Sequence, residues 1–343
     1  MQILHECDAS FRSNLVQNLN VNAIKIAIDL VAKEVAMSRI SILGTIENIR
    51  SRSSVYTPLI EAIINSVDSI VESEVTDGNI EIVLIRQRNL AFDDIIQNVE
   101  SIEIKDNGIG FNQKHRDSFD TFYSEQKKRE GGKGFGRFLY LKYFNQVKID
   151  STFKDETGAF YSRKFNFGKQ YEIIVDEKIE KSEAKQAHTT VYLNTLKDGN
   201  HFDKNLETIS RKILEKILIL FIDDSFKCPT ITIREDDRSQ SIVLNHFLKD
   251  LDSEIQLISG QKFELAGEKE GEIFGFNLKI FKLYFPGNMK SKVSLTAHKR
   301  EVTDNHLHVY YPEFEDDFYD EFERKDGSLT KKNYIIKSYI LGK

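Results

Sequence analysis

Hydrophobic residues recur along the chain at two spacings, one typical of helices and one typical of strands. Apolar side chains at every third or fourth position predict a helix beginning at Thr57, with Thr57 as its N-cap and Pro58 in its first turn, and another over 203–222. Alternating apolar and polar residues predict strands at 79–86, 101–105, 145–152, 159–167, 171–176 and 189–194. The strand pattern returns after residue 225. These elements predict an α+β fold with helices gathered on one face of a sheet.

Turn residues and changes in pattern divide the chain into three predicted parts. Residues 1–50 have helical spacing and few turn residues, which indicates a helical segment or strap before the main domain. Asp198, Gly199 and Asn200 form a predicted turn near a domain boundary, so we expect one domain over 51–200 and a second over 201–343. Because the sequence ends on the strand-like run YIIKSYILGK, we expect the chain to be part of a longer protein.

Composition indicates a globular protein with no membrane segment. Hydrophobic residues make up 40% and charged residues 30% of the sequence, and the apolar run 217–222 is far shorter than the roughly 20 residues that span a bilayer. Cys7 and Cys228 lie far apart, which argues against a disulfide framework or a zinc site and favours a cytoplasmic location. The net charge of -6 argues weakly against a dedicated nucleic-acid surface.

The predicted helix after Thr57 carries a narrow polar stripe on an otherwise apolar surface. Glu61, Asn65 and Asp68 fall within about 60° of one another around a helix. The stripe is either the solvent-exposed face of the helix or part of a magnesium and phosphate site. In the second interpretation Asn65 supplies a neutral oxygen ligand for the cation, and the carboxylate of Glu61 orients or deprotonates an attacking water.

Two glycine clusters follow, separated by about the length of a helix. The first, in Asp106-Asn107-Gly108-Ile109-Gly110, comes directly after a predicted strand and is also compatible with an ordinary hairpin turn. The second, GGKGFGRF at 131–138, leads into an apolar helical run, where backbone N–H groups and the helix dipole can hold phosphate. Because no Lys-Ser or Lys-Thr pair follows the last glycine, this loop is not a Walker A motif.

The order and spacing of these three motifs resemble the N, G1 and G2 boxes of the GHKL ATPases. That superfamily includes gyrase B, MutL, the ninety-kilodalton heat-shock chaperone, MORC proteins and histidine kinases. The resemblance covers roughly residues 50–195 and implies a Bergerat-type α/β sandwich that binds ATP. A further match is AHTTVYLN, where the family places a threonine beside the adenine-binding aspartate; Thr190, and less readily Thr189, occupies that position.

The resemblance also implies roles for the matched residues. Asp106 would accept a hydrogen bond from the adenine amino group, with Thr190 supporting it through water, and Asn65 would bind Mg²⁺. Residues 117–130 would form the lid over the nucleotide. The remaining nucleotide-binding positions that it implies are Asp68, Gly108, Gly110, Gly132, Lys133, Gly134, Phe135, Gly136 and Arg137. Among these, the glycines let the backbone approach the nucleotide, and Lys133 or Arg137 would neutralise phosphate charge.

The region after residue 225 resembles the transducer domain of the hydrolytic members of this superfamily. That domain has a ribosomal-protein-like βαβ fold, and a basic residue on one of its loops reaches the γ-phosphate of ATP. In TAHKREV the candidates are Lys299 first and Arg300 second, next to His298. The alternative is a basic surface turn beside Glu301.

The motifs together predict a Mg²⁺-dependent ATPase that switches conformation, by analogy as an ATP-dependent homodimer clamp acting on a protein or DNA client. Glu61 favours the hydrolytic branch, because histidine kinases usually lack an acid at this place and transfer phosphate to a protein histidine. One alternative is a nucleotide-sensing binding module with little turnover in a larger defence or DNA-processing assembly. A histidine-kinase-type phosphotransferase is the third interpretation.

Overall fold

The computed structural model describes residues 41–48, 53–88, 96–121, 136–248, 254–267, 269, 271–285, 289–297, 299–323 and 327–342. Most of the predicted strap at 1–50 and residues 122–130 of the predicted lid lie outside the described residues. So do four site candidates, which are Gly132, Lys133, Gly134 and Phe135.

The first sheet has eight strands in the order β5-β4-β3-β6-β2-β1-β7-β8. Its strands are β1 (Asn79–Arg86), β2 (Val99–Asp106), β3 (Phe144–Lys154), β4 (Phe160–Phe167), β5 (Ile174–Lys181), β6 (His188–Leu196), β7 (Thr230–Glu235) and β8 (Ser241–Val243). β1 and β7 are parallel, and the other neighbouring pairs are antiparallel. The predicted strands are confirmed, although β5 begins at Ile174 rather than at residue 171.

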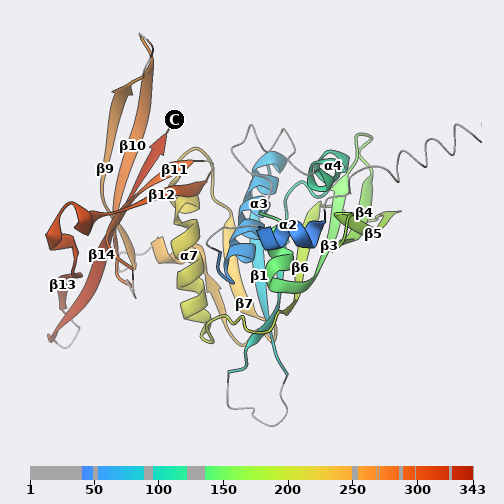
Figure 1. The fold of residues 1–343 in the computed structure, drawn as a ribbon, viewed down its shortest axis with the longest axis horizontal. Helices are drawn as coiled ribbons and strands as arrows, with labels where there is room; N and C mark the ends of the chain where they lie inside the picture. The colour runs from blue at the N-terminus through green and yellow to red at the C-terminus, as the bar shows by residue number, and fades with distance from the viewer. Residues whose placement is uncertain are drawn as a thin grey trace, which may run out of the picture.

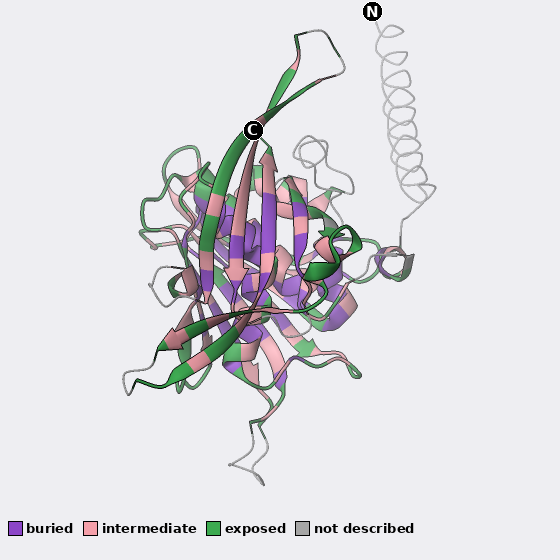
Figure 2. Cartoon of the chain, turned by 90° about the vertical axis from the view of Figure 1, so that its left-hand side faces the viewer, coloured by how far each residue is buried: buried purple, intermediate pink, exposed green. Residues whose placement is uncertain are grey.

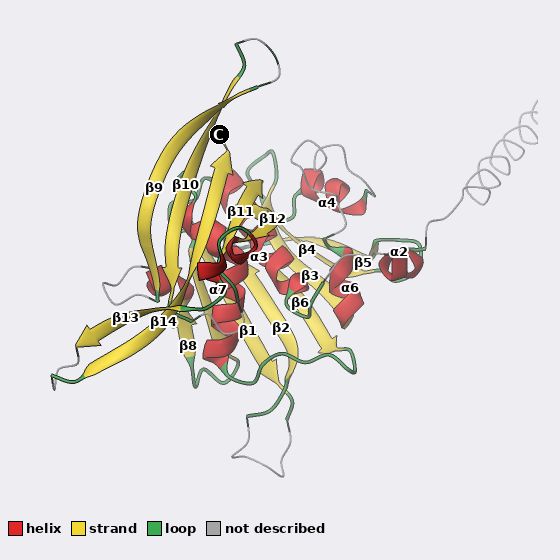
Figure 3. Cartoon of the chain, turned by 60° about the vertical axis from the view of Figure 1, so that its left-hand side comes forward, coloured by secondary structure: helices red, strands yellow, loops and turns green. Residues whose placement is uncertain are grey.

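Helices cover one face of this sheet (Figures 1 and 3). They are α2 (Ile42–Asn48), α3 (Thr57–Ser73), α4 (Gln113–Asp120), α6 (Phe138–Tyr143) and α7 (Leu206–Ile222). The alternation of side chains along the strands determines which face of the sheet the helices cover. Ile80, Ile82 and Leu84 of β1 are fully buried on that face and lie opposite inward-facing residues of β2. Among the described helices, none combines the length and hydrophobicity that a membrane crossing requires.

The predicted helix at Thr57 is confirmed as α3, but the prediction that Thr57 is its N-cap was wrong. Tyr56 occupies the N-cap position, and the hydroxyl of Thr57 instead accepts a hydrogen bond from the backbone N–H of Ser54 at 2.9 Å. Pro58 lies in the first turn as predicted. The apolar side of α3 buries Leu59, Ile63 and Val67 completely, and each such side chain contributes about 1.5–3 kcal/mol through the hydrophobic effect.

Helix α7 lies between the first sheet and a second one (Figure 1). Asn205 caps it by accepting hydrogen bonds from the N–H groups of Glu207 at 2.7 Å and Thr208 at 3.3 Å, so the helix begins at Leu206 rather than at the predicted 203. Because both of its sides are covered, α7 buries apolar residues around most of its circumference, from Leu206 to Ile222.

The second sheet has the order β12-β11-β14-β10-β9, with β13 paired to β14. Its strands are β9 (Ile255–Ala266), β10 (Ile273–Leu283), β11 (Lys292–Ala297), β12 (Arg300–His306), β13 (Phe318–Glu323) and β14 (Leu329–Gly342). Figure 2 shows its buried residues gathered in the middle of the molecule, while the β9–β10 and β13–β14 hairpins extend outward. The structure thus confirms an α+β fold with a second, sheet-based part. β11 and β14 are parallel neighbours, and the described chain between them contains β12, β13 and two short 3-10 helices, η2 (Leu307–Val309) and η3 (Pro312–Phe314).

A buried charge network fixes β12 against β14 and α7. Glu301 of β12 forms ion pairs with Lys337 of β14 at 2.7 Å and with Lys292 of β11 at 3.2 Å. Lys337, which is 1% exposed, also donates to the backbone carbonyl of Glu215 in α7 at 3.0 Å. Burial alone would raise the pKa of Glu301, but the two lysines outweigh it and lower the pKa. Since removing one partner of a buried ion pair typically costs about 3–5 kcal/mol, the network holds β12 firmly in place.

Candidate functional site

The polar stripe of α3 faces two segments that are far away in the sequence. Glu61 and Asn65 are half-buried, and Asp68 is exposed. Glu61 pairs with Arg300 of the second sheet, and the side-chain amide of Asn65 contacts the phenol of Tyr140 in α6. The stripe is therefore a contact surface between α3, α6 and the second sheet, and it is not simply a solvated helix face.

Asp106 ends β2 with its carboxylate on the helix-covered face of the sheet, 4% exposed. The hydroxyl of Ser66 in α3 donates to Oδ2 at 3.0 Å, and the backbone N–H of Gly108 donates to Oδ1 at 2.9 Å. Burial raises the pKa of Asp106 to about 6, although these hydrogen bonds oppose the shift. A carboxylate has about four lone-pair positions, so Asp106 keeps the capacity to accept another donor.

Thr189, and not Thr190, lies beside Asp106, which corrects the sequence-based preference. In the β2–β6 pair Asp106 is opposite Thr189, while Thr190 is opposite Lys105. Directly opposed residues point to the same face of a sheet, so Thr190 points away from Asp106. The hydroxyl of Thr189 also lies 2.9 Å from the hydroxyl of Ser151 in the neighbouring strand β3. The family's supporting threonine is therefore matched in space by Thr189.

The glycines of the first cluster allow the loop after β2 to pass close beneath its neighbours. A Cβ on Gly108 would lie 2.2 Å from Oγ of Ser69 and 2.7 Å from the backbone of that residue, too close for any other amino acid. Gly110 has a φ of 80° and packs against the backbone of Thr152 in β3. The hydroxyl of Ser151 accepts a hydrogen bond from the N–H of Phe111 at 2.8 Å and so fixes the loop. This geometry excludes a simple hairpin turn. A hairpin would pair β2 with the next strand in the chain, β3, but β2 pairs with β1 and β6.

The end of the second glycine cluster contacts Glu61 directly. A Cβ on Gly136 would lie 2.1 Å from Oε2 of Glu61, so only glycine allows the loop to approach the carboxylate this closely. Gly136 leads into α6, as the sequence pattern predicted for the loop and the following helix. The first glycine cluster and the described end of the second thus both contact α3, one at Ser69 and the other at Glu61.

Arg137 is buried against the end of α4, and its predicted role in neutralising phosphate charge stays a prediction. Its side chain is 3% exposed and donates to the backbone carbonyls of Ser118 at 3.1 Å and Thr121 at 2.6 Å, at the end of α4. The guanidinium also lies over the rings of Phe119 and Phe138. These contacts make Arg137 a support for α4.

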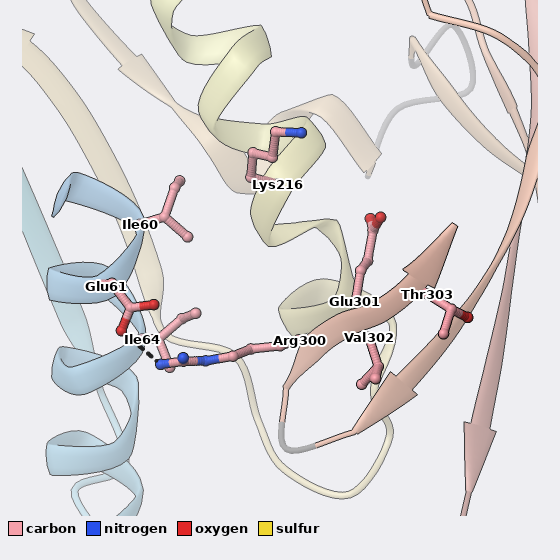
Figure 4. A pocket seen from close by; sticks show the side chains of 8 residues that line it. All are labelled: Ile60, Glu61, Ile64, Lys216, Arg300, Glu301, Val302 and Thr303. Carbon is pink, nitrogen blue, oxygen red and sulfur yellow. Dashed lines mark hydrogen bonds and ion pairs between the residues drawn. The ribbon is translucent and has the colours of Figure 1, made fainter. Parts of the chain in front are cut away.

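Two neighbouring basic residues connect the second sheet to α3. Arg300 donates to Oε2 of Glu61 at 2.8 Å (Figure 4), and Lys299 pairs with Oδ1 of Asp68 at 2.6 Å. Lys299 has a φ of 60°, an uncommon conformation for a residue with a Cβ, in the turn between β11 and β12. A cavity of about 300 Å³ lies beside these pairs, between α3, Lys216 of α7 and residues 300–303 of β12. The turn therefore docks on α3 and is not a free surface loop.

Sequence reasoning missed several residues that the structure places at the site. Ser66 and Ser151 interrupt apolar faces of predicted elements, and this signal was available in the sequence. Tyr140 falls in the apolar helical run after the second glycine cluster. Its hydrogen bond with Asn65 was not predicted, because Asn65 is distant in the chain. The partner of Glu301, Lys337, is distant in the same way. The contact of Glu301 with Lys337 depends on strand pairing in the second sheet, and the contact of Tyr140 with Asn65 depends on the packing of α6 against α3. Sequence spacing alone predicts neither contact.

The geometry agrees with comparisons to known proteins. Residues 54–195 match the family model described as histidine kinase-, DNA gyrase B-, and HSP90-like ATPase. This part of the chain is a GHKL ATPase domain, as the three motifs predicted. The search of curated proteins found no match.

Two solved structures are similar to the chain at 12% sequence identity, each with a TM-score of 0.43. The N-terminal domain of a DNA repair protein matches 83% of this chain and 86% of its own chain. The 43K ATPase domain of Thermus thermophilus gyrase B, solved in complex with an aminocoumarin, matches 87% of this chain and 81% of its own.

The described residues fit an adenine nucleotide with Mg²⁺. Asp106 is a buried acceptor at the end of a strand, and Gly108 and Gly136 leave no side chain between the loops and α3. The amide nitrogen of Asn65 donates a hydrogen bond to Tyr140, so the amide oxygen remains as a ligand for a hard cation. Asn65, Asp106 and the glycines would hold the nucleotide and its metal.

The raised pKa of Asp106 predicts that nucleotide affinity falls in mild acid. Between pH 7 and pH 5 the fraction of Asp106 present as carboxylate drops about tenfold, because its pKa is about 6. Affinity for ATP, measured by calorimetry, should fall by about the same factor relative to Asp106→Asn, whose amide oxygen accepts a hydrogen bond at either pH. Since ATP titrates equally in both experiments, identical pH curves for the two proteins would contradict this role.

Proposed function

We propose that the chain is a Mg²⁺-dependent ATPase that couples ATP binding and hydrolysis to a change of conformation. The observations that support it best are three contacts along α3, those of Ser66 with Asp106, Glu61 with Gly136 and Asn65 with Tyr140. A buried acceptor for adenine, a neutral oxygen for the metal and a carboxylate beside a glycine loop are the parts that ATP hydrolysis needs.

In the proposed reaction, Glu61 orients a water molecule in line with the γ-phosphate and accepts its proton. The water oxygen forms a bond to the γ-phosphorus, and the bond from that phosphorus to the β–γ bridging oxygen breaks. ADP and inorganic phosphate are the products. Mg²⁺, held with the help of Asn65, would neutralise charge that develops on the phosphate oxygens.

Lys299 and Arg300 would sense the γ-phosphate from the second sheet. Their ion pairs with Asp68 and Glu61 place both cations next to the proposed catalytic carboxylate. A γ-phosphate competes for these cations with the carboxylates of α3, so ATP binding would shift the turn between β11 and β12. Glu301 and Lys337 would pass this shift to β14 and α7.

ATP would also bring two copies of the chain together as a clamp on a protein or DNA client in the cytoplasm. The support is the analogy of the fold with other members of the superfamily. A non-hydrolysable ATP analogue should shift the elution volume from that of a monomer to that of a dimer. A monomer in the presence of the analogue would contradict the clamp.

A second candidate is a nucleotide sensor with little turnover. The observation that favours it is the ion pair between Arg300 and Glu61, which occupies one oxygen of the catalytic carboxylate. Such a protein would bind ATP with Mg²⁺ and change conformation without releasing phosphate.

Replacing Glu61 by Gln separates the two candidates. If Glu61 activates water, Glu61→Gln should lower the rate of phosphate release by about 10²–10⁴-fold and leave ATP binding nearly unchanged. Glu72→Gln is the matched control, because Glu72 lies on the same helix and pairs with Lys114 and His115 at the surface. Wild-type protein that binds ATP but releases no phosphate would contradict the ATPase and favour the sensor, whereas equal phosphate release by wild type and Glu61→Gln would contradict the role of Glu61.

A further inference from the structure

Tyr140 occupies a position between the proposed metal ligand and the proposed catalytic base. It lies in α6, directly after the second glycine cluster, and it is 2% exposed. Its phenol oxygen accepts a hydrogen bond from Nδ2 of Asn65 at 3.2 Å. None of the three motifs includes this residue, so its contact with Asn65 comes from the packing of α6 against α3.

The hydrogen bond distinguishes the two ends of the Asn65 amide. An asparagine amide carries a donor and an acceptor, and its terminal torsion has two broad minima related by a half-turn. Only the oxygen can bind Mg²⁺. With its nitrogen engaged by Tyr140, the amide of Asn65 leaves its oxygen for the cation.

Tyr140 is a neutral hydroxyl at neutral pH, because an ordinary phenol has a pKa of about 10 and burial raises the pKa of this one further. A neutral hydroxyl keeps lone pairs on its oxygen, and one of them accepts the hydrogen bond from the N–H group of Asn65.

We propose that Tyr140 is a positioning residue that sets the amide of Asn65 with its oxygen towards Mg²⁺. The proposal rests on the proposed function of the site. It predicts that loss of the hydroxyl weakens metal binding more than it weakens the fold, because the ring of Tyr140 still fills the same space.

Tyr143 provides a matched control on the same helix. It is 7% exposed, and its hydroxyl donates at 2.9 Å to Oγ of Ser53, a residue that lies before α3. Tyr143→Phe therefore removes a hydroxyl of similar burial that makes no contact with a proposed metal ligand.

The test measures ATP binding by calorimetry as a function of Mg²⁺ concentration, together with thermal unfolding. Tyr140→Phe should raise the Mg²⁺ concentration for half-maximal binding by about 10-fold or more, the usual effect of losing a residue that orients a metal ligand. Tyr143→Phe should leave it unchanged. A shift in the melting temperature with a wild-type Mg²⁺ dependence would show that Tyr140 is purely structural and would overturn the proposal.

A second variant tests the orientation of the amide itself. Asp has two equivalent oxygens, so in an Asn65→Asp background the choice of amide end no longer exists. Adding Tyr140→Phe to Asn65→Asp should then leave the Mg²⁺ dependence unchanged, and a full 10-fold shift in that background would overturn the proposal. The wild type reports separately on the proposed function, because a chain that binds no ATP at saturating Mg²⁺ contradicts the ATPase itself.

Discussion

The close approach of bare backbone to helix α3 is the constraint on which the rest of the site depends. Gly108 lies against the backbone of Ser69, and Gly136 lies against the carboxylate of Glu61. Any side chain at either position would push a loop away from α3 and separate Asp106 from Ser66 or the second glycine cluster from Glu61. The helix contributes the polar groups, and the glycines determine how closely the two loops approach them. The chemistry of the site therefore follows from packing first and from charge second.

Charge then connects this site to the second sheet. Arg300 and its neighbour Glu301 point in opposite directions from the start of β12, one to Glu61 of α3 and the other to Lys337 of β14. Arg300 is partly exposed and can exchange partners at modest cost, whereas Lys337 is buried and cannot lose Glu301 without leaving an unpaired charge. The start of β12 therefore combines an exchangeable contact with α3 and a fixed contact with β14.

Periodicity predicted the elements well where burial is one-sided. Helix α3 and strand β1 were located correctly because their apolar residues face a single core. The choice between Thr189 and Thr190 could not be made in this way, since a shift of one residue in strand register exchanges the two faces of the sheet. The hydrogen bonds of Arg137 were not predicted, because its sequence neighbours belong to the second glycine cluster while its carbonyl partners lie at the end of α4. The contacts of Tyr140 and Lys337 join elements that are distant in the chain, and local sequence patterns carry no information about them.

The most direct test of the account compares ATP with inosine triphosphate, which carries an oxygen in place of the adenine amino group. The comparison uses calorimetry at neutral pH with Mg²⁺, in Glu61→Gln protein so that neither nucleotide is consumed. Because a hydrogen bond to a charged acceptor contributes about 1.5–3 kcal/mol, a buried Asp106 that accepts from the amino group predicts binding of ATP at least about tenfold tighter. Equal affinities for the two nucleotides, or no binding of either, would contradict the assignment of the site.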